Sequence, residues 1–392
     1  MNKALFVILA TVALDAIGAG IIYPILPDLL SEVTGGGDIG FLYGALLAVF
    51  AVMQFVFSPV LGALSDRYGR RPVLLLSLAG TLADYLVLAF SPLGWVLVAG
   101  RAIAGITSAN MAVANAYITD ITPAEHRAAR FGSVGAVLSL GFIIGPVIGG
   151  ALGAWWLRAP FLAAALFNGL NLLVALFVLP ESRSGTPGRL DWKELNPLAS
   201  LLWLWKFKAL LPLVTASVVF SLVAAIPGTI WVLHGAERFG WDSMHMGLSL
   251  SAFGICSALA QTFLVGPLSR RLGDAGTLVC GIAFDLLAYV LMAFADRGWM
   301  GYAVAPLFAL GGVAMPALQA LVTGRVGDDR QGQLQGVLAS LTSLAGIVGP
   351  VLSTALFFST KTTWIGTVWL AGAALYLLAS PLLLTVRKPR AD

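Results

Sequence analysis

Residues 62–70 read GALSDRYGR, and residues 266–274 read GPLSRRLGD. The two stretches lie 204 positions apart and are identical at five of nine positions. At the same offset, Gly145-Pro146 returns as Gly349-Pro350. We therefore predict that the chain contains two copies of one structural unit, each marked by a short charged loop between hydrophobic segments.

The mismatches between the two stretches include an exchange of charge. Asp66 corresponds to Arg270, and Arg70 corresponds to Asp274. Within each copy the acid and the base stand four residues apart, so their side chains can meet on a turn of helix. The spacing therefore allows an ion pair in each copy.

The composition is that of a membrane protein. Of 392 residues, 59% are hydrophobic and 11% are charged, whereas a soluble domain has about 25% charged residues. The mean hydropathy is +0.91, and a water-soluble fold has no place for so much apolar surface. The pI of about 9.2 does not indicate a nucleic-acid partner, because the basic residues are scattered in small groups without forming a patch.

Twelve segments are long and apolar enough to cross a bilayer, which takes about 20 mostly apolar residues. A polar linker, residues 181–208, separates them into two groups of six. We therefore predict an all-α membrane protein whose twelve transmembrane helices form two pseudo-symmetric six-helix bundles, residues 1–180 and 209–392. The expected spans are 4–30, 41–63, 73–91, 94–116, 129–153, 159–180, 209–234, 243–266, 276–294, 297–322, 333–358 and 363–385.

The cationic residues predict the orientation of these spans, because cytoplasmic loops are rich in lysine and arginine. Of the 23 lysines and arginines, Arg101 lies within a span, and all but four of the others fall on one face of the membrane. The four exceptions are Arg158, Arg238, Arg297 and Lys361. Both termini and the linker are therefore expected in the cytoplasm.

Glycine residues in the fifth span predict close helix packing. Gly141, Gly145, Gly149 and Gly153 recur every four residues. Such a stripe of small residues lets two helix backbones approach closely in lipid. The simplest role is a contact between helices, and the alternative is a hinge or a tight seal.

Four ionisable residues lie within the expected spans: Asp15, Asp84, Arg101 and Asp285. Each costs about 2.5–3.5 kcal/mol at the centre of a bilayer, so they must face a wet cavity or one another. Buried structural ion pairs are one interpretation. The other is proton coupling, because a carboxyl group in a low-dielectric cavity can hold a proton and release it when a cation binds nearby. We expect the acids to carry protons and Arg101 to tune their protonation.

A second group of charged residues lies at the cytoplasmic ends of the expected spans. Its members are Asp66, Arg70, Arg71, Asp120, Arg127 and Arg130. They either set the topology or form a network that holds one conformation together and is released in another. We expect Asp66, close to Asp120 and Arg127, to be the centre of such a latch.

Polar and aromatic side chains within spans are candidates for substrate contact. They make hydrogen bonds between helices or serve as anchors in an otherwise apolar pocket. The selected candidates are Gln54, Asn110, Trp231, Gln261 and Gln319. The sequence has no GxxxxGK[ST] and no HExxH motif. We therefore expect no enzyme, no intrinsic metal or other cofactor, and coupling to an ion gradient, which suits a duplicated helical protein.

Three motifs resemble those of the major facilitator superfamily. Residues 62–71, GALSDRYGRR, match the signature of the loop between its second and third spans. Residues 101–105, RAIAG, resemble its fourth-span motif. Residues 141–150, GFIIGPVIGG, resemble the fifth-span motif that is typical of exporters. The resemblance implies two six-span halves and favours antiport over uptake.

A closer resemblance, to bacterial tetracycline/proton antiporters, extends over nearly the whole chain. The residues that carry it are 14–16, 24–27, 70–78, 84–85, 238–241, 316–319 and 331–336. In that family the drug leaves as a chelate with a divalent metal, in exchange for a proton. The residues that match the family's functional acids and bases are Asp15, Asp66, Asp84, Asp285, Arg70, Arg101 and Arg127.

The chain departs from that family where the substrate is expected to bind. Residues 108–111, SANM, stand where those exporters typically have small residues. Ala225 stands where many carry glutamine, and Ser257 stands where several carry histidine.

The resemblance implies a proton-coupled exporter of tetracycline that confers antibiotic resistance. We expect a monomer in the bacterial inner membrane, with a divalent cation such as Mg²⁺ carried only with the drug. The alternative is a broader multidrug or metabolite/proton antiporter of the same fold. A membrane sensor without transport and an intramembrane enzyme are less favoured, because all three intramembrane acids are present and no catalytic constellation is found.

Overall fold

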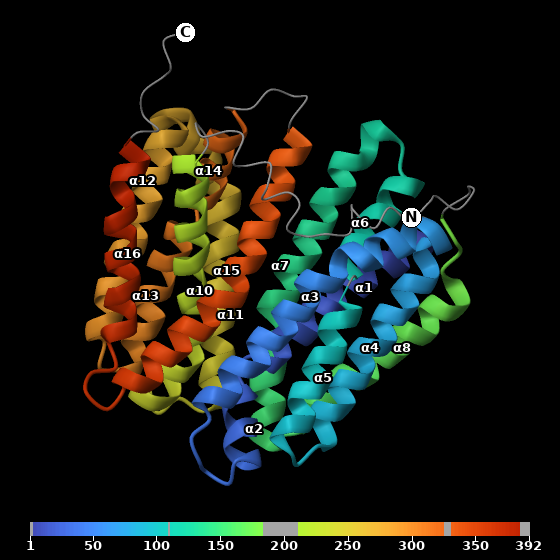
Figure 1. Cartoon of the computed structure of the whole chain (residues 1–392), viewed down its shortest axis with the longest axis horizontal. Helices are drawn as coiled ribbons and strands as arrows, with labels where there is room; N and C mark the ends of the chain where they lie inside the picture. Colours follow the sequence, from blue (N-terminus) through green and yellow to red (C-terminus); the bar gives the residue numbers. More distant parts are fainter. Residues whose placement is uncertain (1–2, 109, 183–210, 325–330, 385–392) are drawn as a thin grey trace. The chain divides into compact units, whose positions relative to one another are not determined.

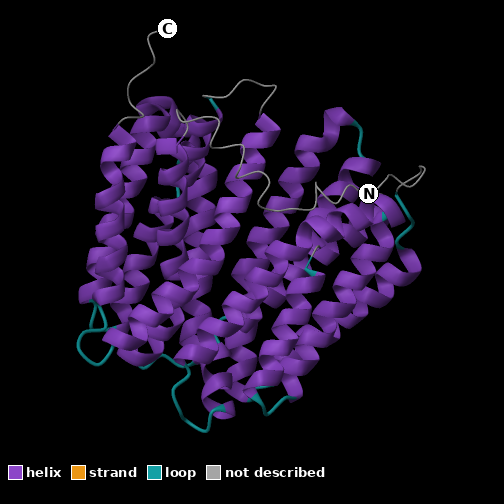
Figure 2. Cartoon of the chain, in the orientation of Figure 1, coloured by secondary structure: helices purple, strands orange, loops and turns teal. Residues whose placement is uncertain are grey.

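A computed structural model describes residues 3–108, 110–182, 211–324 and 331–384 of the chain. Within these ranges every regular element is an α-helix and no strand occurs (Figure 2). The predicted all-α class is therefore confirmed. Most of the predicted linker, residues 183–208, lies outside the described residues.

The helices follow the order of the predicted spans. The first part of the chain contains α1 (Lys3–Ile22), α2 (Leu26–Val33), α3 (Gly40–Tyr68), α4 (Arg70–Phe90), α5 (Gly94–Thr107), α6 (Asn110–Ile121), α7 (Ala124–Trp155) and α8 (Ala159–Val178). The second part contains α10 (Leu211–Phe239), α11 (Ser243–Phe263), α12 (Val265–Phe294), α13 (Gly298–Gly311), α14 (Ala314–Thr323), α15 (Gln331–Thr360) and α16 (Thr367–Leu384).

The lengths and hydropathies of these helices fit a membrane. Among the described residues, 11 helical segments are long and apolar enough to cross a bilayer. A shorter apolar segment, Thr367–Ala379, lies within α16. Together these segments follow the twelve predicted spans in order.

Three of the predicted spans are interrupted, which the hydropathy did not reveal. The first span stops at the end of α1 and resumes as α2, close to Pro24 and Pro27, whose rings and missing N–H groups disfavour a continuous helix. The fourth span is divided between α5 and α6, and the tenth between α13 and α14. Thr107 and Gly311, which end α5 and α13, are 204 residues apart. The two copies therefore break at the same place.

The helices form two compact units. The first comprises residues 1–197 with 242–251, and the second comprises residues 198–241 with 252–392. In the first unit α1 packs against α7 and α8, while α4 packs against α5 and α8 (Figure 1). In the second unit α10 packs against α15 and α16, while α12 packs against α13 and α16. Corresponding helices thus have corresponding neighbours, as the sequence repeat predicted.

The glycine stripe of the fifth span lies on the side of α7 that faces α1. A Cβ atom added to Gly145 would meet the carbonyl oxygen of Ile17, and one added to Gly149 would meet that of Ile21. The two backbones approach closely because these positions have no side chain. The predicted close contact between helices is confirmed.

Candidate functional site

The charged loop of the first unit folds into a tight reversal between α3 and α4. Gly69 lies at the turn with a φ of 105°, a conformation that glycine adopts without steric cost. The reversal directs Arg70 back toward the last turn of α3. There Nη1 of Arg70 lies 2.8 Å from Oδ1 of Asp66 and donates a hydrogen bond to Oγ of Ser65 at 2.7 Å. The ion pair that the spacing allowed between Asp66 and Arg70 is therefore present.

Arg70 also joins this loop to α6. Its Nε lies 3.1 Å from Oδ2 of Asp120, and its side chain is only 11% exposed. Next to this contact, Arg127 on α7 donates hydrogen bonds to the carbonyl oxygens of Thr119 and Thr122, both at 3.2 Å. The structure thus assembles four of the predicted latch residues in one place. They are Asp66, Arg70, Asp120 and Arg127.

The two other predicted latch residues lie on α4 and α7. Nη2 of Arg71 donates a hydrogen bond to the carbonyl oxygen of Leu176 at 2.6 Å, so it ties the start of α4 to α8. Arg130 lies one turn after Arg127 on α7 and is half-buried. Arg71 therefore supports the network through the backbone of a neighbouring helix.

Two residues that follow α8, Glu181 and Ser182, take part in the same network, and neither was predicted from the sequence. The carboxylate of Glu181 accepts hydrogen bonds from the backbone N–H groups of Arg70, at 2.8 Å, and Arg71, at 3.2 Å. Oγ of Ser182 donates to Oδ2 of Asp120 at 3.1 Å. A carboxylate at a helix N-terminus is favoured by the helix dipole. The only signal in the sequence was an acid placed directly after the sixth span.

Within the described parts of the chain, the second copy of the loop shows local contacts. Gly273 interrupts α12 with a φ of 66°. Oγ of Ser269 donates to Oδ1 of Asp274 at 2.5 Å, and Nε of Arg270 donates to the carbonyl oxygen of Gly266 at 3.3 Å. The second pair that the spacing allowed, Arg270–Asp274, is not among the ion pairs of the described residues.

The break between α5 and α6 gathers polar side chains of the first unit. Nδ2 of Asn110, the first residue of α6, donates to Oδ1 of Asp15 on α1 at 2.9 Å. Nε2 of Gln54 on α3 donates to Oγ of Ser108 at 2.8 Å. Discontinuous helices often provide binding groups in transporters, because their interrupted backbone lines a cavity. Two of the predicted substrate residues, Gln54 and Asn110, therefore lie at this break.

Asp84 and Arg101 form a buried ion pair within the first unit. Nε of Arg101 lies 3.0 Å from Oδ1 of Asp84, and a second contact joins Nη2 to Oδ2. The side chain of Asp84 is 1% exposed and that of Arg101 is 14% exposed. The guanidinium also lies 5.5 Å from the centre of the Phe50 ring. This geometry fits both earlier interpretations, a structural pair and a charge that tunes protonation.

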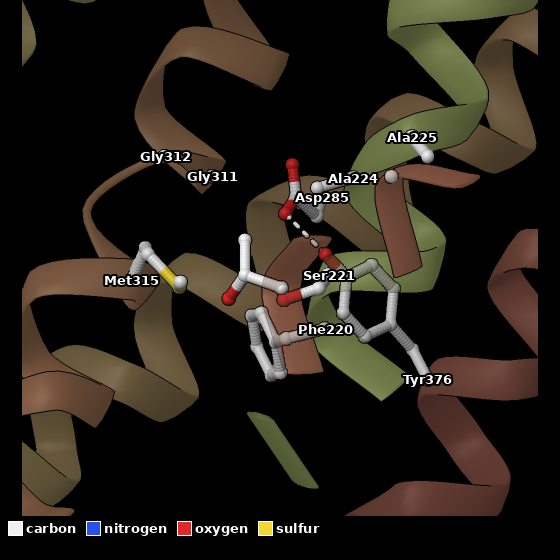
Figure 3. Close-up of a pocket in the computed structure, with 11 residues that line it drawn as sticks. Phe220, Ser221, Ala224, Ala225, Asp285, Gly311, Gly312, Met315 and Tyr376 are labelled. Carbon is white, nitrogen blue, oxygen red and sulfur yellow. Dashed lines mark hydrogen bonds between the residues drawn. The ribbon is translucent and has the colours of Figure 1, made fainter. Parts of the chain in front are cut away.

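Asp285 lies on the wall of a cavity in the second unit, where α13 ends (Figure 3). The cavity has a volume of about 350 Å³. Oη of Tyr376 on α16 donates a hydrogen bond to Oδ2 of Asp285 at 2.8 Å. An apolar cavity with a few directed polar groups is the usual form of a small-molecule site. The lining residues are Phe220, Ser221, Ala224, Ala225, Asp285, Gly311, Gly312, Met315, Thr342, Gly346 and Tyr376.

The lack of a side chain at Gly311 makes room for the carboxyl group of Asp285. A Cβ atom added at Gly311 would overlap both the carboxyl carbon and Oδ1 of Asp285. The acid therefore packs directly against the main chain of the break between α13 and α14. Gly311 and Tyr376 do not stand out in the sequence, because their contact with Asp285 exists only in the folded unit.

The three remaining substrate candidates lie away from this cavity. Trp231 is buried in an aromatic cluster, with its ring centre 6.3 Å from that of Trp241 and 6.0 Å from that of Phe308. Gln261 on α11 and Gln319 on α14 are exposed. None of the three is among the residues that line the described cavity.

Two repeated helical units, with acids buried in their membrane spans and a charge network at one loop, define a membrane transporter. The sequence model of the Major Facilitator Superfamily matches residues 8–294 and 213–392. The tetracycline resistance protein of class C from Escherichia coli is 50% identical over 97% of this chain and 96% of its own. This chain belongs to the major facilitator superfamily and, within it, to the family of the tetracycline resistance proteins.

Further relatives agree with this assignment. The class G protein of Vibrio anguillarum is 45% identical over 98% of both chains, and the class B protein of Escherichia coli is 39% identical over 96% of this chain and 94% of its own. Because the superfamily consists of transporters, the chain is a transporter and not an enzyme.

Solved structures support the fold. The nucleoside transporter NupG covers 100% of both chains with a TM-score of 0.80 at 16% sequence identity. The human organic anion transporter MFSD10 (TETRAN) covers 97% of this chain and 99% of its own, with a TM-score of 0.69 at 24% identity. At such low identities the likeness concerns the fold alone. The predicted major facilitator fold is confirmed.

Proposed function

We propose that this protein exports tetracycline from the cytoplasm across the bacterial inner membrane, in exchange for protons, and thereby confers resistance to the drug. The observation that carries the proposal is the similarity to several tetracycline resistance proteins over nearly the full chain. The sequence of this transporter has no P-loop motif. We therefore propose that the energy for export comes from an ion gradient.

The intramembrane acids support proton exchange. Asp15 has an amide partner, Asp84 has an arginine partner, and Asp285 has a phenol partner. A carboxyl group in a cavity of low dielectric constant takes up a proton readily, and a cation that binds beside it favours the charged form. Cargo and proton therefore compete for the same acid, and Asp285 lines a cavity in the second unit.

The network around Arg70 supports a latch. One guanidinium holds carboxylates from α3 and α6, and the residues that follow α8 join the same network. Charge-assisted hydrogen bonds of this kind are strong and directional. Their formation in one conformation and release in another gives a transporter two discrete states.

The divalent cation is proposed as part of the cargo. Hard cations such as Mg²⁺ bind several converging oxygen ligands. In the described part of the chain, no group of three or more histidine, cysteine, aspartate or glutamate side chains gathers in one place. A chelate supplies oxygen ligands from the drug, so the protein needs to supply only a favourable charge.

The proposed orientation has both termini in the cytoplasm, and the proposed functional form is a monomer. The orientation rests on the cationic residues, nearly all of which fall on one face of the membrane. Each unit carries its own candidate acid and its own helix break, so one chain contains the whole set of groups that the exchange uses.

One observation favours a broader drug specificity as a second candidate function. Ala225, which stands where many tetracycline exporters carry glutamine, lines the cavity beside Phe220 and Met315. This part of the wall is mostly apolar, and its polar side chain is the hydroxyl group of Ser221. Such a wall accepts many lipophilic ligands, because apolar contacts discriminate weakly among shapes of similar size.

Transport into inverted membrane vesicles tests the proposal. We expect tetracycline uptake that requires an imposed proton gradient and a divalent cation, and that stops when excess chelator is added. Export of several lipophilic cations without a divalent metal would favour the multidrug alternative. Uptake that continues without a proton gradient would contradict proton coupling.

A further inference from the structure

The environment of Asp285 contains one hydroxyl group that is held in place by its own packing. The ring of Tyr376 is 2% exposed. It meets the ring of Phe220 edge-on at 4.9 Å and the ring of Tyr289 edge-on at 5.9 Å. Because these neighbours fix the ring, the hydroxyl group remains 2.8 Å from Oδ2 of Asp285. Figure 3 shows the phenol and the carboxyl group facing each other at the edge of the cavity.

The opposite side of the carboxyl group is fixed by the backbone. Gly311 leaves no room for a side chain beside Asp285, as the overlap of a built Cβ atom shows. The carboxyl group is therefore held between the phenol of α16 and the main chain at the end of α13. Two constraints from two helices leave it one orientation, in which it faces the cavity.

We propose that Tyr376 is a positioning residue for Asp285: its hydroxyl group holds the carboxylate between the cavity and the Gly311 backbone, and so sets when Asp285 takes up the proton. The inference rests on the proposed exchange of drug for protons. It deepens that proposal, because it assigns control of the proton-binding group to a residue that carries no charge itself.

Among the described residues that line the cavity, few other groups can influence the protonation of Asp285. From α16 the titratable group that faces it is Tyr376, and from α12 itself it is Tyr289, whose hydroxyl group donates to the carbonyl oxygen of Val223 at 2.6 Å. The residues of α10, α13, α14 and α15 that line the cavity are phenylalanine, serine, alanine, glycine, methionine and threonine. None of these types is charged, so Tyr376 is the polar contact that matters most.

In the proposed step Asp285 takes up and releases one proton, and Tyr376 stays protonated throughout. In the charged state Tyr376 donates its hydroxyl hydrogen to the carboxylate, as observed. A proton that arrives through the cavity binds the carboxylate and gives the neutral acid, while the phenol keeps its own hydrogen. Because a phenol oxygen can also accept a hydrogen bond, Tyr376 can remain in contact with the neutral acid. Cargo with a positive charge then favours the return of the carboxylate and the release of the proton.

The substitution Tyr376→Phe tests the proposal, because it removes the hydroxyl group and leaves the ring that packs against Phe220. A hydrogen bond to a charged group favours the charged form. Its loss should therefore move the midpoint of the pH profile of exchange to higher pH by about one unit. We would measure the profile of tetracycline/proton exchange in inverted vesicles. The infrared absorbance of the protonated carboxyl group can be titrated with pH, with Asp285→Asn as the blank. The midpoint of this titration should move to higher pH by the same amount.

Tyr289→Phe is the matched control. It removes a buried phenol hydroxyl from a neighbouring ring, but that hydroxyl is bonded to a backbone carbonyl and not to Asp285. We expect this variant to keep the parental midpoint even if its amount in the membrane is reduced. Equal midpoints in Tyr376→Phe and the parent would overturn the inference. Absence of proton-dependent tetracycline exchange in the parent itself would instead overturn the proposed function.

Gly311→Ala gives a second test that does not involve Tyr376. The added methyl group must displace the carboxyl group of Asp285, so the infrared titration of that group should change and exchange should fall by about tenfold or more. Gly228→Ala is the control, because a Cβ atom there meets nothing within 4 Å. A Gly311→Ala variant with the parental titration and rate would show that the backbone of the break does not hold Asp285.

Discussion

In the first unit Gly69 turns the chain between α3 and α4, and in the second unit Gly273 interrupts α12 at the position 204 residues later. The two loops therefore share a backbone feature. They differ in what their side chains reach. Arg70 contacts carboxylates on two helices, whereas Arg270 contacts a carbonyl oxygen one turn before it on the same helix.

The difference lies partly in what surrounds each loop. The residue that corresponds to Asp120 in the second unit is Gly324, which has no carboxylate to offer. Both copies have the backbone break, but among the described residues the charge network that joins several helices is seen in the first copy. A sequence motif therefore predicts a turn more reliably than it predicts a latch.

The helix breaks in the fourth and tenth spans also differ between the two units, in the residues that surround the intramembrane acid. In the first unit the break carries Asn110, which contacts Asp15 across the space between two helices. In the second unit the break carries Gly311, and the acid itself packs against the backbone beside a cavity. Among the described residues, the first unit thus shows the loop network that spans several helices, and the second shows an acid that lines a cavity.

Asp285→Asn should have the largest effect, because it removes the acid of the second unit. We expect proton-dependent exchange to fall to the background of empty vesicles, with the protein still present in the membrane. Asp296→Asn is the matched control, since Asp296 is exposed just beyond the end of α12. If Asp285→Asn kept the parental rate and pH dependence, the assignment of the proton to the second unit would be wrong.

Asp66→Asn and Asp274→Asn compare the two loops directly. The first weakens the network around Arg70, so we expect turnover to fall by about tenfold or more while equilibrium binding of the drug changes little. The second removes the contact that Asp274 makes with Ser269 and should leave turnover near the parental value. Equal losses in the two variants would show that both loops act as latches. A loss of drug affinity at normal turnover would remove Asp66 from the latch.

Much of the fold could be predicted from the sequence. An apolar stretch of about 20 residues predicts a membrane span, and the sequence repeat predicts two units of similar fold. The order of the spans and a close helix contact at Gly145 followed from such local signals, whereas the partner helix, α1, is known only from the structure. The breaks after Thr107 and Gly311 could not be predicted, since apolar segments of the same length form continuous helices as readily.

For the candidate site, the charged residues could be predicted from the sequence but their partners could not. Charged residues in an apolar span stand out because they are costly, and this identified Asp15, Asp84 and Asp285. Their partners did not stand out. Tyr376 and Glu181 lie far along the chain from the groups they contact, and a tyrosine or a loop acid is common enough to pass unnoticed.

Glu181→Gln should have a moderate effect that is confined to the first unit. The change removes the negative charge that the backbone N–H groups of Arg70 and Arg71 face, which costs up to about 1 kcal/mol at a helix N-terminus. Hydrogen exchange of those two amides should become up to about fivefold faster. Amides at the start of α12 should exchange as in the parent. An unchanged rate at Arg70 would mean that the carboxylate does not cap α4.

Asn110→Ala should have the smallest effect on exchange, and it gives the first break the residue type that the second break has at Ala314. The variant removes the donor to Asp15, but Asp15 is only half-buried, so water can replace part of the lost hydrogen bond. We expect a change of about threefold in KM or turnover, with a smaller shift of the pH profile than in Tyr376→Phe.

The double variant Asp15→Asn with Asn110→Asp then tests whether the two side chains act as a pair. It keeps one carboxylate and one amide in contact across the break, with their positions exchanged. If the pair is what matters, the double variant should retain more exchange than Asp15→Asn alone, because a carboxylate is still present beside the break. If Asn110→Ala were as inactive as Asp285→Asn, the amide would act on the drug directly, and the two breaks would be equal partners in binding.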